Sequence, residues 1–154
     1  MYPILLTAAY MAAVLVSSTA FATDEACSLI TQAQVSAALE IPVDAGTPIG
    51  RPSSCQWTGK RFATLVMIQP RGGKTPVESF NAGKTSTIPG IIAEPVGGVG
   101  DDAYFVYFNT KERSGLGLVV KKGPSAFEIR VYGSELDKAK SVAKTLSQTV
   151  AGKM

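Results

Sequence analysis

Residues 116–132, LGLVVKKGPSAFEIRVY, are the stretch of sequence that most clearly indicates the fold. The middle of this stretch, Lys122-Gly123-Pro124-Ser125, is a cluster of turn-forming residues, and an apolar run precedes it. After the turn, apolar and polar side chains alternate: Phe127, Ile129 and Val131 against Glu128, Arg130 and Tyr132. A period of two is typical of a strand with one buried face and one face in water. The stretch therefore predicts an antiparallel hairpin of residues 116–121 and 126–132.

Further strands are expected on both sides of this hairpin. Residues 103–108 would extend it into a meander, and the nearly continuous apolar run 62–69 is typical of a central strand covered on both faces. Residues 55–58 and 91–96 are shorter candidates, the second weakened by Pro95. We expect the aromatic side chains of these strands in the core, namely Trp57, Tyr104, Phe105, Tyr107 and Phe108.

Three helices are indicated by their start signals. Thr31 with Gln34, and Thr75 with Glu78, have the spacing of a capping box, and Pro76 suits the first helical position. Pro42 is expected to close the first helix. The last helix is expected to begin at Ser134 and to bury Leu136, Ala139, Val142, Ala143, Leu146 and Val150. The order α-β-β-α-β-β-β-β-α predicts an α+β domain, with an antiparallel sheet of about five to six strands flanked by helices.

The first 22 residues have the composition of a signal peptide. They carry no charged side chain, the run 4–16 is apolar, and Ala20-Phe21-Ala22 is a small-x-small cleavage pattern. The positive charge of the n-region is the terminal amine alone, which leaves an uncleaved anchor as the alternative. No lipobox cysteine follows, so a lipid anchor is not expected. We predict cleavage, one globular domain over residues 23–154, no stable membrane insertion, and a periplasmic or secreted location.

The two cysteines, Cys27 and Cys55, both follow this leader. An even pair in an oxidising compartment predicts a disulfide, and a reactive thiol beside a buried one is the alternative.

The composition excludes several kinds of catalytic site. The chain has no histidine, which removes Ser-His-Asp and Cys-His catalysis and histidine-based zinc sites. The glycines near Lys74 and Lys84 lack the P-loop spacing. Residues 98–103 fit the G-x-G-x-x-A pattern of dinucleotide-binding proteins, but they lead into a strand rather than a helix, so that geometry is absent. Asp101 and Asp102 are adjacent on an extended chain, so they would face opposite sides. We therefore predict no catalytic, cofactor-binding or metal-binding residues, and no enzyme.

Positive charge is concentrated between residues 46 and 90. The net charge is +3, and this segment has six basic residues against Glu78: Arg51, Lys60, Arg61, Arg71, Lys74 and Lys84. Lys60, Arg61, Arg71 and Lys74 are a candidate surface for an anionic partner, and solvated surface charges are the alternative. The strand 62–69 would separate the two pairs, which favours an extended polymer or a membrane face over a small anion. No nucleic-acid module is indicated.

Several short motifs together resemble a known family. They are Cys27-Ser28-Leu29-Ile30-Thr31, Gln34-Val35, Ala38-Leu39, Cys55-Gln56-Trp57 and the run from Gly98 to Tyr104. This pattern resembles a family of uncharacterised exported proteins, mostly actinobacterial lipoproteins, catalogued as a domain of unknown function. The resemblance implies a Mog1/PsbP-like sandwich and a disulfide between the two cysteines. It implies no activity, and the missing lipobox departs from the family pattern.

These observations favour a non-catalytic extracytoplasmic binding or accessory domain, whose partner would be an unknown protein or an envelope polymer. An inhibitor of a secreted or cell-wall-acting enzyme is the alternative, with residues 109–115 as its exposed loop. An unusual enzyme using Lys, Asp/Glu or Ser/Lys chemistry and an assembly or adhesion subunit are further classes.

Overall fold

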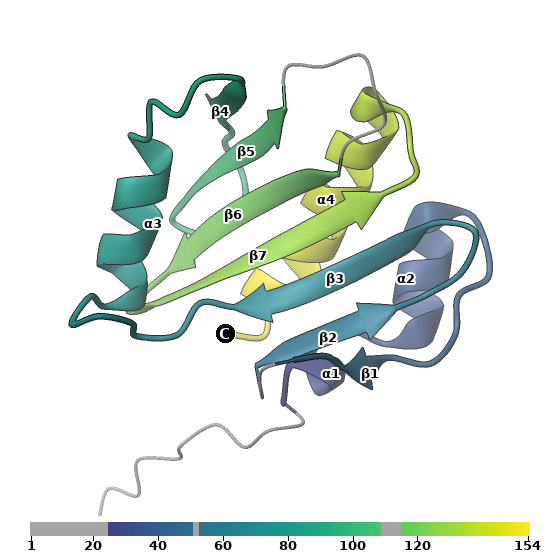
Figure 1. Ribbon diagram of the computed structural model, residues 1–154. Coiled ribbons are helices and arrows are strands. Elements are labelled where there is room, and N and C mark those ends of the chain that lie inside the picture. The colour runs from purple at the N-terminus through teal and green to yellow at the C-terminus, as the bar shows by residue number, and fades with distance from the viewer. Residues whose placement is uncertain (1–24, 51–52, 109–114) are drawn as a thin grey trace, which may run out of the picture.

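The computed structural model describes residues 25–50, 53–108 and 115–154 (Figure 1). The elements follow one another as α1 (Glu25–Leu29), α2 (Gln32–Leu39), β1 (Thr47–Pro48), β2 (Ser54–Trp57), β3 (Phe62–Met67), α3 (Pro76–Lys84), β4 (Ile91–Pro95), β5 (Asp102–Phe108), β6 (Leu116–Lys122), β7 (Ser125–Tyr132) and α4 (Leu136–Ala151). The α+β class is confirmed. Within the described residues, none of the helices is both long and apolar enough to cross a membrane.

The strands form one antiparallel sheet in the order β1-β2-β3-β7-β6-β5-β4. The described part of the chain thus contributes seven strands, so the expected five to six was too few; β1 has only two residues and leaves no periodic signal. The hairpin of β6 and β7 forms as predicted, with Lys122 opposite Ser125. At the centre of the sheet, β3 pairs with β7, and Leu65 lies opposite Ile129.

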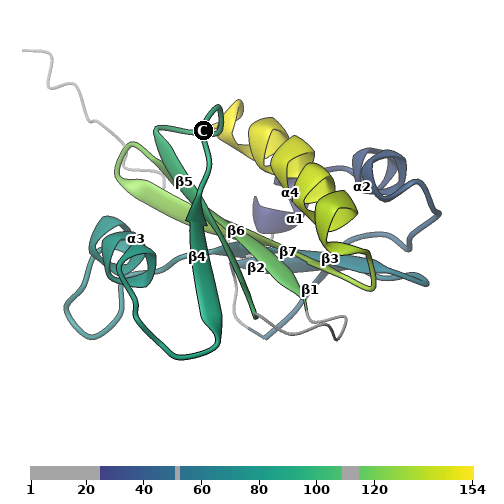
Figure 2. The same ribbon diagram turned by 90° about the horizontal axis from the view of Figure 1, so that it is seen from above.

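One face of the sheet carries most of the core. Helices α1, α2 and α4 lie on this face, and α3 lies on the other (Figure 2). Leu65, Leu118 and Ile129 point from the sheet into the larger cluster, where they meet Leu39 and Leu146 from the helices. A smaller cluster on the opposite face consists of Phe80, Tyr104, Val119 and Ala126.

The capping boxes at α2 and α3 are both present. The Thr31 and Thr75 hydroxyls accept hydrogen bonds from the backbone N–H groups of Gln34 and Glu78, each at 3.2 Å. The end of α2 comes before Pro42, because Glu40 already adopts a left-handed conformation with φ 57°.

The start of the last helix was predicted wrongly. Helix α4 begins at Leu136 with Glu135 as its N-cap, and the Ser134 hydroxyl makes no hydrogen bond. Leu136 is 43% exposed rather than buried, because the stripe that faces the sheet begins only at Ala139.

The expectation that β3 is covered on both faces holds only for the middle of the strand. Ala63 and Leu65 face the main core; on the other side Thr64 is 5% exposed, but Phe62 and Val66 are half-buried. That side of β3 lies beyond the reach of α3, which packs on β6 and β7.

Candidate functional site

Only one end of the second sheet face is covered. Helix α3 attaches there through Phe80, whose ring centroid lies 5.1 Å from that of Tyr104. Gly83 lets the helix approach closely, since a Cβ at this position would lie 2.2 Å from the Tyr104 hydroxyl oxygen. The resulting burial raises the pKa of Tyr104 to about 12. The rest of this face, toward β3 and the far ends of β5 and β7, carries no helix of the described chain (Figure 1).

A row of apolar side chains crosses this uncovered part. Phe62 on β3 lies opposite Tyr132 on β7, and their rings stack with centroids 4.4 Å apart and planes 15° apart. Tyr132 leans over Gly115, where a Cβ would lie 2.2 Å from its Cε1. Phe108 on β5 lies opposite Ile91 on β4 and is 53% exposed. Phe108 was expected in the core, and that expectation was wrong because no helix of the described residues covers the end of β5.

A second row lies two residues along the strands. Its charged member is Arg130, whose Nη2 lies 2.7 Å from Glu128 Oε2; the Glu128 side chain is 14% exposed and that of Arg130 is 46% exposed. This hydrogen bond raises the pKa of Arg130. The cross-strand neighbours of Arg130 are Thr64 and Gly117, both small. We name Phe62, Phe108, Arg130 and Tyr132 the open face; Thr64, on the same side of β3, is only 5% exposed.

The candidate anion-binding residues divide into two pairs at opposite ends of β3. Lys60 and Arg61 lie in the β2–β3 turn, and Arg61 Nη1 donates to the Leu39 carbonyl at 3.4 Å. Arg71 and Lys74 bond to each other through their backbones, around a glycine pair with positive φ. Arg51 lies outside the described residues. An anionic-partner role for these four side chains stays a prediction.

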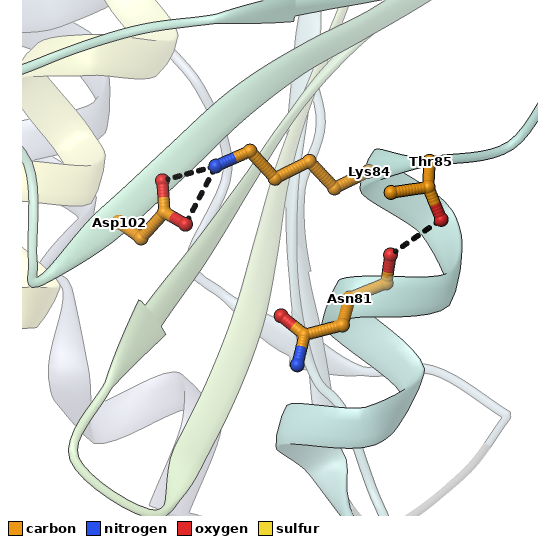
Figure 3. Close-up of polar contacts among 4 residues, drawn as sticks. All are labelled: Asn81, Lys84, Thr85 and Asp102. Carbon is orange, nitrogen blue, oxygen red and sulfur yellow. Dashed lines mark hydrogen bonds and ion pairs between the residues drawn. The ribbon is translucent and has the colours of Figure 1, made fainter.

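Asp101 and Asp102 make two different contacts, of which Figure 3 shows that of Asp102 with Lys84. Asp101 accepts from the Gly123 backbone N–H at 2.7 Å, which is the main reason that its pKa is lowered. Asp102 accepts from Lys84 at 2.7 and 2.8 Å, and this bond lowers its pKa. Two carboxylates held by separate partners do not form one ligand site or an acid–base pair.

The contact of α4 with β4 and β5 contains a polar cluster that the sequence analysis missed. Glu94 Oε2 accepts from the Tyr107 hydroxyl at 2.7 Å and from Lys140 Nζ at 2.6 Å. These bonds raise the pKa of both donors and lower that of Glu94. Tyr107 and Lys140 are therefore held protonated, which is unsuited to a nucleophile or a general base. The three residues lie far apart in sequence, and no local motif joins them.

A groove of about 420 Å³ lies between α2 and α4, on the other side of the sheet. Its lining combines apolar side chains such as Val142 and Leu146 with the hydroxyls of Ser141, Thr145 and Thr149. Lys138 and Glu40 form an ion pair in it. The groove holds no unpaired carboxylate that could act on a substrate.

Cys27 and Cys55 form the predicted disulfide, with an S–S distance of 2.03 Å and Cα atoms 5.1 Å apart. Cys55 is fully buried, and the bond joins α1 to β2. Both cysteines of the chain are used, so the reactive-thiol alternative is excluded. Among the described residues, no three His, Cys, Asp or Glu side chains gather as a metal site would require.

Comparison of the chain with models of protein families, with curated proteins and with solved structures found no match.

Proposed function

We propose that this protein is a non-catalytic extracytoplasmic binding or accessory domain that contacts its partner through the open face. The observation that carries the proposal is the unequal covering of the sheet. Three helices pack on one face, whereas α3 covers only one end of the other. The stacked pair of Phe62 and Tyr132, together with Phe108 and Arg130, remains accessible there. Exposed apolar side chains gathered in one place, with a polar rim, are typical of an interaction surface.

The charged groups support binding rather than chemistry. Within the described chain, the carboxylates of Glu40, Glu94, Asp101, Asp102 and Glu128 each lie against a lysine or arginine. Hydrogen bonds lower the pKa of the Glu40, Glu94, Asp101 and Asp102 carboxyls, and a carboxylate with a lowered pKa is a weak general base. Together with the lack of histidine in the sequence, this leaves little for a catalytic mechanism to use.

The extracytoplasmic location is supported by two independent features. One is the leader-like composition of residues 1–22, which lie outside the described residues. The other is the Cys27–Cys55 disulfide, since such bonds persist mainly in oxidising compartments. At the coarse level of an antiparallel sheet flanked by helices, the fold agrees with a Mog1/PsbP-like sandwich, and this finer similarity is part of the proposal.

The test is site-specific cross-linking in cells that export the protein. A photoreactive side chain at Phe108 should give adducts that a photoreactive side chain at Leu136 does not. Leu136 is a matched control, because it is a similarly exposed apolar residue on the opposite side of the sheet. Adducts from neither position, or equal adducts from both, would contradict binding through the open face.

An inhibitor of a secreted or cell-wall-acting enzyme is the second candidate. Residues 109–114, the greater part of its expected contact loop, lie outside the described residues. Replacing 109–114 by a glycine–serine loop separates the candidates, because an inhibitor would lose its partner whereas binding through the open face would persist.

A further inference from the structure

We infer that the open face binds a carboxylated polysaccharide chain, laid across the strands with sugar rings against the aromatic row and a carboxylate on Arg130. This inference rests on the proposed function and specifies the partner. Three features support it: the size of the accessible apolar band, the edges of the sheet, and the chemistry of the two rows.

The size of the band disfavours a globular partner. The row from Phe62 to Ile91 crosses five strands, which at about 4.8 Å per strand is a length of about 19 Å. The two rows lie about 7 Å apart, so the band and its side chains cover on the order of 300 Å². A stable protein–protein interface buries roughly 800 Å² on each partner. A single extended chain fits the band better.

The edges of the sheet disfavour a peptide that adds a strand. At the β4 edge, the Ile91 N–H already bonds to the Ile88 carbonyl, and Pro95 has no N–H to offer. At the other edge, β1 has only two residues, one of which is Pro48. Strand addition needs a row of free backbone groups, and these two edges do not present one. The partner must therefore contact side chains on the face.

The first row matches the apolar faces of sugar rings. Pyranose rings present C–H groups that pack against aromatic rings. Phe62 and Tyr132 stack on each other, so one face of each ring is already used, and a sugar would contact the remaining accessible surface of the pair. Tyr132 is further fixed over Gly115. Phe108 lies on a strand two removed from β7, which is about 10 Å from Tyr132 at the strand spacing. This separation allows two rings of one chain to be contacted at once.

The second row supplies the charge selection. Glu128 accepts from the Arg130 guanidinium and the Tyr132 hydroxyl also interacts with it, but the side chain remains 46% exposed, so part of the guanidinium faces solvent. Its neighbours open no pocket beside it, since Thr64 is only 5% exposed and a Cβ at Gly117 would collide with Glu128 Oε1, so a ligand reaches the guanidinium from its solvent-exposed side. Arginine binds carboxylates in a forked geometry, so a second carboxylate can accept from guanidinium N–H groups that Glu128 does not use. Exposed Lys60, close to Phe62 along the chain, adds positive charge at the end of the row.

The experiment is affinity electrophoresis of the protein in its exported form, in gels that contain polygalacturonate, neutral amylose, polyglutamate or polyphosphate. We expect retardation by polygalacturonate only. Phe108→Ala and Arg130→Gln should each weaken it about tenfold, the usual effect of losing one charged hydrogen bond or one buried ring contact. The matched controls Leu136→Ala and Arg71→Gln should bind like the unchanged protein.

The outcomes separate this inference from the proposed function. Equal retardation by polyglutamate or polyphosphate, insensitive to Phe108→Ala, would mean attraction by charge alone and would overturn the inference. Loss of binding in Arg71→Gln instead of Arg130→Gln would move the site to the far end of β3 and overturn it as well. If no polymer retards the protein but Phe108 still gives cross-links in cells, the polysaccharide is wrong and the open face stands. If both fail, the proposed function fails too.

Discussion

Lys84 Nζ lies 2.8 and 2.7 Å from the two carboxylate oxygens of Asp102, so the last residue of α3 is bonded to the first residue of β5. Between these two residues, the chain crosses from α3 to the edge of the sheet and forms β4. The ion pair therefore closes the segment that carries Ile91, at one end of the open face. It also removes Lys84 from the group of basic residues available to a partner.

The first prediction concerns the pH dependence of this ion pair. Because Lys84 lowers the pKa of Asp102 from its ordinary value of 3.8, the pair stabilises the fold fully above that value. The stabilisation is lost as the pH falls through the lower pKa of the folded state. Both side chains are about one third exposed, so we expect Asp102→Asn to cost only about 0.5–1 kcal/mol near neutral pH.

The measurement is urea unfolding of the wild type and Asp102→Asn at about pH 7, 4 and 2.5. The two proteins should converge at the lowest pH. In a Lys84→Met background, Asp102→Asn should have no comparable pH-dependent effect, and a persistent difference there would assign the pKa shift to another group.

The second prediction concerns Gly115, the glycine beneath Tyr132 on the open face. Gly115→Ala places a methyl group 2.2 Å from the Tyr132 ring, and we expect the free energy of unfolding to fall by about 1–3 kcal/mol. Gly97→Ala is the matched control, since a Cβ there meets no atom within 4 Å, and its effect should be neutral or stabilising by up to about 1 kcal/mol. Chemical denaturation measures both, and equal effects would contradict the tight contact of Tyr132 with Gly115.

The third prediction concerns the disulfide. Removing it by Cys55→Ser should lower the free energy of unfolding by roughly 2–5 kcal/mol, the usual cost in a small secreted domain. Trp57, the single tryptophan, reports on the bond directly. A Cβ at Gly46 would lie 2.6 Å from the indole nitrogen and 2.8 Å from Cys55 Sγ, so indole and sulfur pack on the same backbone atom. Disulfides quench nearby indoles, and reduction should therefore increase tryptophan emission under native conditions; unchanged emission would count against this packing.

The fourth prediction concerns processing of the N-terminus. We expect the exported protein to begin at Thr23, because Ala20-Phe21-Ala22 precedes the first charged residues. Intact-mass analysis and N-terminal sequencing measure this directly. A chain that begins before residue 18 would favour the uncleaved anchor.

Elements with strong local signals could be predicted from the sequence. The capping boxes at Thr31 and Thr75 form through local hydrogen bonds alone. The threonine hydroxyl accepts from the backbone N–H three residues later, and the Gln or Glu side chain there accepts from the threonine N–H. The alternation along β7 correctly assigned Phe127, Ile129 and Val131 to the core, since a one-residue shift would turn every apolar side chain to water.

Other features depend on tertiary contacts and leave no local pattern. Helix α1 has only five residues and is held by the Cys27–Cys55 bond rather than by helix propensity. The exposure of Phe108 depends on where α3 ends, some twenty residues earlier in the sequence. The open face was predictable only in part. The alternation along β7 indicated that Arg130 and Tyr132 face water, but Phe62, which stacks on Tyr132, was assigned to a strand covered on both faces.

The central pairing of β3 with β7 has a consequence for how the chain assembles. The meander β5-β6-β7 and the hairpin β2-β3 each close short loops, whereas Leu65 and Ile129 meet only after a long stretch of intervening chain has been ordered. Loop-closure entropy makes such a distant pairing slow relative to local hairpins. We therefore expect two half-sheets to form first and to join along this seam in the rate-limiting step. Until they join, the inner edges of both halves are exposed, and a chain that is synthesised in N-to-C order must protect β3 until β7 has followed.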